Sequence, residues 1–229
     1  MELFGHTKDV IRANYFYLME RMCPSKISDA HDIPIIINNY NRLTMLKKLI
    51  DSLTSRGYTN IVILDNQSAY PPLLEWYAKC QFEVIRLPKN YGFKALWKYA
   101  PVRKRFCSDY YIYTDPDVQL SPECPADVVE RMFHILKCKR KKAFKIAPSI
   151  RITGLPDCYE HKQDAIDFES KYFKEQTEED GLTLYRAPID TTFSLYRPRT
   201  GLSRRVSLES YRMAAPSSLR HLPRYQDSA

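Results

Sequence analysis

Two aspartates that flank a proline form the clearest chemical feature of the sequence. Asp115 and Asp117 directly follow the short apolar run 110–113. The proline fixes its own φ and disfavours helix for Asp115, so both carboxylates are expected on a stiff turn. Such a pair could hold Mg²⁺ or Mn²⁺, which take oxygen ligands and share them with substrate phosphates. An Asx-capped turn explains the same residues, and their spacing does not choose between the two interpretations.

The aspartates follow the last of four apolar runs, which read as buried strands. Between the first two runs, apolar residues repeat at helical spacing from Leu43 to Leu53, and Gly57 then provides a stop signal. A second helix is expected to open at Pro71. This alternation predicts an α/β fold with a doubly wound, mostly parallel sheet. The four expected strands are 33–37, 61–64, 84–87 and 110–113.

Polar residues follow each of these runs. In an open parallel sheet, the ligand crevice lies beyond the carboxyl ends of the strands. We therefore expect the four strand ends to converge on one rim, with the aspartate turn among them. The polar segments are 38–42, 65–68, 89–92 and 114–117.

The composition narrows the class of protein. The chain has 229 residues, of which 44% are hydrophobic and 13% aromatic, so it can bury a core and is not a disordered or collagen-like chain. A net charge of +8 favours anionic partners. Six widely spaced cysteines without a CxxC pair suggest reduced thiols. No apolar stretch long enough to cross a bilayer and no secretory signal pattern is present, so we expect a cytoplasmic protein.

The chain is expected to be one domain, 31–229, preceded by a helical arm, 1–30. Within the domain the regular alternation ends at 118, and 119–229 contains two β-like runs, 182–186 and 192–197. The arm has an amphipathic pattern that could lie on a membrane surface, although packing against the body is favoured. The apolar residues of this pattern are Val10, Ile11, Tyr15, Leu18, Met19 and Met22.

Four segments in order resemble the nucleotide-sugar-binding half of GT-A fold glycosyltransferases, especially those of family 2. They are IPIIINNYNRL, IVILDNQS, KNYGFKALWK and YYIYTDPDV, between Ile33 and Val118. A weaker echo lies in PIDTTFSLYRP and RHLPRY. Glycine-rich dinucleotide and P-loop signatures are absent. The resemblance implies a GT-A-like sheet in which 31–118 binds the donor and 119–229 forms the acceptor half, with a C-terminal lid and tail.

The resemblance implies roles for several residues on the donor side. Tyr40 matches the aromatic beside the nucleotide base, and Asp65 matches the acid that hydrogen-bonds the base or ribose. Arg42 and Asn90 are expected to contact the nucleotide, and Lys94 to face its diphosphate. A core aromatic, a turn cap and a solvated helix charge are the competing interpretations of Tyr40, Asp65 and Lys94, respectively.

The resemblance also implies a DxD-type metal site. Asp115 would contact the ribose or a Mn²⁺ or Mg²⁺ ion, Asp117 would bind the metal, and His221 would return as a third ligand. Relatives often carry Trp after the proline of this last segment, whereas here Arg224 follows Pro223.

For inverting transfer, Asp190 matches an acid near the acceptor and would be the general base. Asp157 and Glu160 are alternatives to it. We further expect the loop 199–207 to close on the donor, with one or two arginines clamping its phosphates.

Together these features predict a metal-dependent glycosyltransferase that moves a sugar from a UDP-sugar to an acceptor hydroxyl. The acceptor would be a surface glycan or lipid-linked sugar, and the protein could contact the inner face of a membrane peripherally. A nucleotidyltransferase acting on a sugar phosphate is a second interpretation, although 38–42 lacks the glycine-rich loop it would need. A basic nucleic-acid-binding module ranks third, because acids occupy the expected cleft and the charges are spread along the chain.

Overall fold

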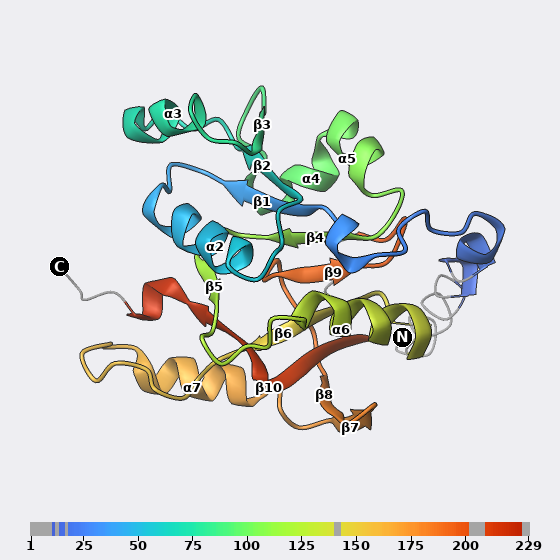
Figure 1. Ribbon diagram of the computed structural model, residues 1–229. Coiled ribbons are helices and arrows are strands. Elements are labelled where there is room, and N and C mark those ends of the chain that lie inside the picture. Colours follow the sequence, from blue (N-terminus) through green and yellow to red (C-terminus); the bar gives the residue numbers. More distant parts are fainter. Residues whose placement is uncertain (1–10, 12–13, 17, 140–142, 202–208, 226–229) are drawn as a thin grey trace, which may run out of the picture.

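The computed structural model describes residues 11, 14–16, 18–139, 143–201 and 209–225 (Figure 1). One mixed sheet runs through the molecule in the order β3-β2-β1-β4-β9-β6-β10-β8-β7, and β5 pairs with β10. The strands are β1 (Ile35–Asn39), β2 (Ile61–Asp65), β3 (Glu83–Arg86), β4 (Tyr111–Thr114), β5 (Val118–Leu120), β6 (Lys145–Ile150), β7 (Gln176–Glu179), β8 (Leu182–Arg186), β9 (Ser194–Tyr196) and β10 (Ser210–His221).

Helical segments connect these strands and cover both faces of the sheet. The α-helices are α2 (Thr44–Thr54), α3 (Pro71–Tyr77), α4 (Ala95–Lys98), α5 (Ala100–Phe106), α6 (Val128–His134) and α7 (Lys162–Ser170). Shorter or irregular helical segments are η1 (Ala30–Asp32), η2 (Gly92–Lys94), η3 (Ile135–Lys139) and η4 (Leu222–Tyr225).

The first half of the chain is a parallel α/β unit, as the sequence predicts. β1 pairs in parallel with both β2 and β4, and β2 pairs in parallel with β3. The four expected strands are found within two residues of their predicted positions, and α2 and α3 begin where the apolar spacing and Pro71 indicate. The α/β fold class is confirmed.

Period-two alternation sends the side chains of β1 to two separate cores. Ile35 and Ile37 pack with Leu46 and Leu49 of α2 on one face. Ile36 packs on the other face with the residues of α4 and α5. Because both faces are covered, β1 and β2 are buried along their whole length. The covering helices hold the carboxyl ends of the strands at a common edge, where the aspartate turn lies.

The second half of the chain extends the sheet mainly with antiparallel strands. β9 lies antiparallel between β4 and β6, and β7 and β8 form an antiparallel edge. β10 pairs in parallel with β6 but antiparallel with β5 and β8. The two predicted β-like runs correspond to β8 and β9. The pairing of β10 with β5 is decisive for the site, because it returns the end of the chain to the aspartate turn.

The N-terminal arm is helical where it is described, at 11, 14–16 and 18–22. It packs on the body through Phe16, whose ring lies edge-on to Phe144 at 5.6 Å between centroids. Glu20 accepts hydrogen bonds from Arg197 and from the Tyr110 hydroxyl. The expected packing against the body is therefore made by one side of the helix. Val10 lies outside the described residues.

A search of the described part of the chain for a helix with the length and apolar character needed to cross a bilayer found none.

Candidate active site

The aspartate turn lies between β4 and β5, at the carboxyl end of the parallel strands. The amide of Asp115 donates to the backbone oxygen of Thr191, and the Thr191 hydroxyl donates to the Asp115 carboxylate. Both aspartates are partly buried. The segment that precedes β9 therefore fixes the first carboxylate of the turn, although the two segments lie far apart in the sequence.

The pKa of Asp115 is raised to about 6, mainly by burial. The hydrogen bond from Thr191 lowers this pKa, and the negative charges of Asp117 and Asp190 contribute to its rise. A buried carboxyl group beside other acids is costly to ionise. A cation bound nearby stabilises the ionised form, so such a site favours cation binding. The electrostatics of the turn are thus those of a place where positive charge binds.

Asp117 lies between two positively charged or polar neighbours from opposite ends of the chain. Its carboxylate accepts a hydrogen bond from Arg42 Nη1 at 2.7 Å. His221 Nε2 lies 3.9 Å from the same oxygen, Oδ2. The histidine is brought there by the antiparallel pairing of His221 with Val118, and the amide of Leu222 donates to the backbone oxygen of Asp117. The expected return of the tail histidine to the turn is seen in the structure.

The His221 imidazole has the properties of an available ligand. Burial lowers its pKa, which keeps the ring neutral near neutral pH, although the charge of Asp117 opposes this. Its Nδ1 is buried and has no hydrogen-bond partner among the described residues. Neutral imidazole and carboxylate oxygens form a donor set that suits Mn²⁺. Within the described residues, however, no three His, Cys, Asp or Glu side chains are grouped closely enough to hold a metal by themselves.

The residues therefore fit a metal that is only partly enclosed by protein. Mg²⁺ and Mn²⁺ commonly use one or two carboxylates and take further oxygen ligands from substrate phosphates. Asp117 and His221 could supply two protein ligands, and Asp115 lies in the same turn. A diphosphate would have to complete the coordination, which links metal binding to donor binding.

A cavity of about 240 Å³ adjoins the turn on the side of β1 and β2. Tyr40 is exposed at its mouth, and the side-chain oxygen of Asn38 is buried there without a partner among the described residues. The Asn66 amide group donates to the backbone oxygen of Gly92 and accepts from the amide of Tyr91, which shapes the wall. The lining residues are Asn38, Tyr40, Arg42, Asn66, Asn90, Gly92, Phe93, Asp115, Pro116 and Asp117.

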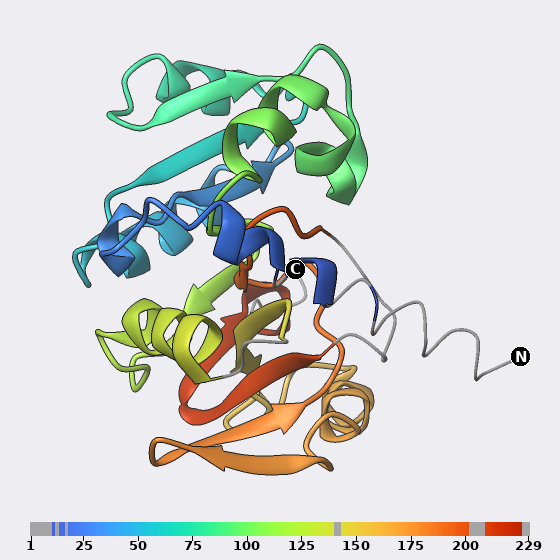
Figure 2. The ribbon, with the colours of Figure 1, turned by 90° about the vertical axis from the view of Figure 1, so that its right-hand side faces the viewer.

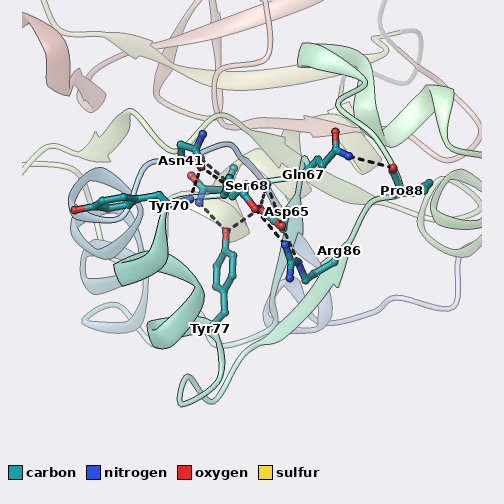
Figure 3. A network of polar contacts seen from close by, with 10 residues as sticks. Asn41, Asp65, Gln67, Ser68, Tyr70, Tyr77, Arg86 and Pro88 are labelled. Atoms are coloured by element: carbon teal, nitrogen blue, oxygen red, sulfur yellow. Dashed lines mark hydrogen bonds and ion pairs between the residues drawn. The ribbon is translucent and has the colours of Figure 1, made fainter.

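Two residues expected on the donor side lie elsewhere. Asp65 is completely buried and accepts hydrogen bonds from the Ser68 amide, Arg86 Nε and the Tyr77 hydroxyl (Figure 3). These contacts stabilise the turn after β2, in agreement with the interpretation of Asp65 as a turn cap. Lys94 does not line the donor-side cavity; its ammonium lies over the Phe93 ring, on the wall of a different cavity.

A second cavity, of about 460 Å³, lies on the other side of the aspartate turn. Asp115 and Asp117 line it together with Asp190, so the turn is shared by both cavities. The loop that carries Asp190 is fixed by buried cations, since Arg212 donates to the backbone oxygen of Pro188 and Lys145 to that of Ile189. Asp190 thus lies beside the turn, and its role as general base stays a prediction. Asp157 and Glu160 do not line this cavity.

Sequence reasoning missed a buried ionic cluster in the wall of the second cavity. Glu169 of α7 is 1% exposed and accepts hydrogen bonds from Arg212 at 2.8 Å and from Arg224 at 3.1 Å. The cluster ties α7 to both ends of β10 and thereby supports the segment that carries His221. Nothing local in the sequence links these residues, and only the arginine after Pro223, a departure from the family pattern, stood out.

Of the arginines at the start of the expected loop, Arg197 lies just before it and Arg199 is its first residue. Arg197 is buried and donates to Glu20 and to the backbone oxygens of Ala143 and Leu136. Arg199 donates to the backbone oxygen of Cys23 in the arm. The remainder of the expected loop, 202–207, lies outside the described residues.

Comparison with known proteins relates this arrangement to one family. A family model described as glycosyl transferase family 2 matches residues 35–137. The fold is similar to that of a mannosyltransferase from Pyrobaculum calidifontis in complex with GDP-Man and Mn²⁺, with a TM-score of 0.51 and 9% identity. Residues 35–137 thus match the family 2 model, and the chain has a GT-A-like fold. At this identity the structural likeness shows the fold alone.

The two structural neighbours are covered to different extents. The alignment with the mannosyltransferase covers 94% of this chain but 65% of that protein, so this chain spans about two thirds of that protein's length. A cytidylyltransferase from Leptospira borgpetersenii aligns with a TM-score of 0.37 and 13% identity over 54% of this chain and 55% of its own. That score is too low to carry an argument. Among curated proteins, no match was found.

Proposed function

We propose that the chain is a metal-dependent glycosyltransferase that moves a sugar from a UDP-sugar to an acceptor hydroxyl with inversion. The observation that carries the proposal is that Asp115 and Asp117 line two cavities at once. A donor nucleotide in the first cavity and an acceptor in the second would meet at these carboxylates. The family 2 match over residues 35–137 supports this assignment.

The first cavity has side chains suited to a nucleoside diphosphate. The exposed ring of Tyr40 offers a face to the base, and the buried oxygen of Asn38 offers an acceptor for a donor group of the base or ribose. Asn90 lies on the opposite wall. Arg42 lies beside Asp117, where it can contact a phosphate and balance the carboxylate. We assign nucleotide contacts to these four residues. We assign none to Asp65, which is buried, or to Lys94, which lines a different cavity.

Asp117 and His221 would hold the Mn²⁺ or Mg²⁺ ion, with Asp115 next to them. A bound ion of this kind supplies Lewis-acid stabilisation of the negative charge on a departing diphosphate. The protein's own contribution is to hold the carboxylates in place through Thr191 and Arg42. The neutral imidazole of His221 adds a nitrogen ligand without adding charge.

Asp190 is the proposed general base. It lines the second cavity on the opposite side of the aspartate turn from the nucleotide cavity, which is the side from which an acceptor would approach for inversion. Its carboxylate would accept the proton of the acceptor hydroxyl as the oxygen attacks the anomeric carbon. Arg212 and Lys145 donate to the two backbone oxygens directly before Asp190, so the base is supported by the rigid sheet.

We further propose that the acceptor is a surface glycan or lipid-linked sugar and that the protein acts in the cytoplasm, in peripheral contact with a membrane. The exposed apolar residues of the N-terminal arm support the membrane contact.

Thermal-shift measurements with UDP, GDP and CTP, each with and without Mn²⁺, test the proposal, because a ligand that binds only the folded state raises the melting temperature. We expect a UDP shift that requires Mn²⁺, is lost in Asp117→Asn and is retained in the exposed control Asp51→Asn. The mannosyltransferase neighbour is in complex with GDP-Man, so a preference for GDP would replace UDP in the proposal. A preference for CTP would favour nucleotidyl transfer. No response to any nucleotide would refute the transferase assignment.

A further inference from the structure

The outer side of the N-terminal helix carries an exposed apolar stripe. Ile11, Tyr15, Leu18 and Met22 are each more than half exposed and lie in helical conformation. Spacings of three and four residues place them on one side of a helix. Glu20 is held on the other side by Arg197 and Tyr110, so the stripe is fixed in its outward direction. Contiguous exposed apolar groups of this kind mark interaction sites.

A basic groove lies on the same side of the molecule. The cavity has a volume of about 770 Å³ and is formed by α4, α5 and the segment after β9. None of the described residues that line it is acidic, and no ion pair is recorded for its cations with any described residue. Four of the five cations are exposed and one is half-buried. The cations are Lys94, Lys98, Arg103, Lys104 and Arg199.

Direct contacts join the groove to the helix stripe. Arg199, which lines the groove, donates to the backbone oxygen of Cys23 just after the helix, at 3.4 Å. The Ser25 hydroxyl and the Lys26 amide donate to Asp109, the residue directly after Ser108, which lines the groove. Figure 2 shows the N-terminal helix and the pair α4 and α5 on the face turned toward the viewer. The stripe and the groove thus lie on the same side of the molecule and are joined through the segment 23–26.

We propose that this surface binds the face of an anionic lipid bilayer. The stripe would enter the boundary between headgroups and acyl chains, as interfacial amphipathic helices do, and the groove would take up lipid phosphates. The combination favours a membrane over nucleic acid, because Ile11, Leu18 and Met22 offer no ring for base stacking but gain from burial in lipid. The proposal rests on the peripheral membrane contact proposed above. It assigns that contact to the stripe and the groove, and it requires negatively charged lipid.

The position of the surface relative to the candidate active site follows from the direction of β1. The arm leads into the amino-terminal end of β1, whereas the aspartate turn lies at the carboxyl end of the parallel strands (Figure 1). A bilayer bound at the arm would therefore lie toward the amino-terminal end of β1, although the groove extends to Lys94, next to Gly92 and Phe93 of the donor-side cavity.

Flotation of the full chain with lipid vesicles tests the proposal. We expect binding to phosphatidylcholine vesicles that contain phosphatidylglycerol and weak binding to phosphatidylcholine alone. The double variant Arg103→Gln/Lys104→Gln should lower the partition coefficient about fivefold for each cation removed. Leu18→Ser should lower it several-fold on both kinds of vesicle. Raising the salt from about 0.1 M to about 1 M, which shortens the Debye length to about 3 Å, should remove most of the preference for anionic lipid.

Matched control variants show whether vesicle binding depends on this surface or on exposed cations and apolar side chains anywhere on the protein. Lys48→Gln removes an exposed cation on α2, and Tyr70→Ser removes an exposed aromatic near α3; neither should change vesicle binding. Circular dichroism of each variant verifies that it is folded. Equal binding to neutral and anionic vesicles, or equal effects of test and control variants, would overturn the proposal. So would RNA binding that depends on Arg103 and Lys104 but not on Leu18, without vesicle binding.

The Mn²⁺-dependent nucleotide shift, measured on the same preparations, distinguishes the two proposals. A chain that binds UDP but no vesicles would overturn the membrane surface alone. A chain that binds anionic vesicles but no nucleotide would overturn the transferase assignment alone.

Discussion

Replacing Asp115 with asparagine should stabilise the protein in the absence of metal. Burial raises the pKa of this carboxyl from 3.8 to about 6, so holding it ionised at neutral pH costs free energy that an uncharged amide does not. At about 1.4 kcal/mol for each pH unit, the difference corresponds to about 3 kcal/mol as an upper limit. The amide oxygen of Asp115→Asn can still accept the hydrogen bond from Thr191, so we expect a gain between about 1 and 3 kcal/mol.

The pH dependence of this gain provides its signature. Because the pKa is higher in the folded than in the unfolded state, the cost of Asp115 is fully present above about pH 6 and vanishes as the pH falls through 3.8. The advantage of Asp115→Asn should therefore be constant near about pH 8 and fall to about half at about pH 5.

Urea denaturation in EDTA at several pH values measures the effect, and each kcal/mol should also raise the melting temperature by about 2–4 °C for a chain of this size. The exposed Asp51→Asn serves as the control and should leave stability within about 0.5 kcal/mol. Mn²⁺ with UDP should stabilise the wild type and not Asp115→Asn. An asparagine variant that is no more stable than the wild type at about pH 8, or whose advantage does not shrink in acid, would refute the reasoning.

Three further substitutions test other parts of the site. Glu169→Gln removes the buried charge between two arginines and should lower the free energy of unfolding by about 3 kcal/mol. The exposed Glu175→Gln is the control and should lower it by less than about 0.5 kcal/mol. Equal losses in the two variants would contradict a structural role for the cluster. Tyr40→Ala should weaken UDP binding in calorimetry about tenfold through lost stacking, and Tyr70→Ala should not, so similar affinities in all three proteins would place the base elsewhere. His221→Gln should weaken Mn²⁺-dependent nucleotide binding about tenfold while leaving the circular dichroism spectrum unchanged, and unchanged binding would contradict the ligand role.

The sequence predicts the parallel half of the fold well because its information there is local. Apolar runs and helical spacing define each strand and α2, and short connections leave few topologies open. The second half was harder to predict because its pairings are not local. β9 inserts between β4 and β6, and β10 pairs with three strands, which no periodicity within 119–229 specifies. The ionic partners of Glu169 depend on those pairings and were missed for the same reason.

Within the site, strand register explains why one expected nucleotide contact lies in the core. Asn39 pairs with Asp65 across β1 and β2, so the two side chains share a face and meet the Tyr77 hydroxyl below the sheet. Asn38 and Asn66, one position away on each segment, face the cavity. A shift of one residue exchanges the faces of a strand, and the ends of apolar runs are not known to that accuracy from sequence. The segment after β2 thus reaches the cavity through Asn66, whereas Asp65 itself does not line it.

The two aspartates of the turn lie within the segment that the family model matches, but residues beyond that segment contact them. The family match therefore accounts for only part of the site. The match ends at residue 137, yet Thr191 holds Asp115 and His221 approaches Asp117 from β10. The matched segment thus supplies both carboxylates and the lining of the first cavity, while the remaining segment supplies contacts that orient the carboxylates and most of the lining of the second cavity. Because β9 and β10 are inserted into the same sheet, the site forms only when both halves have folded together. Metal-dependent donor binding should therefore be lost in the same transition as the β-sheet on denaturation, not in an earlier step.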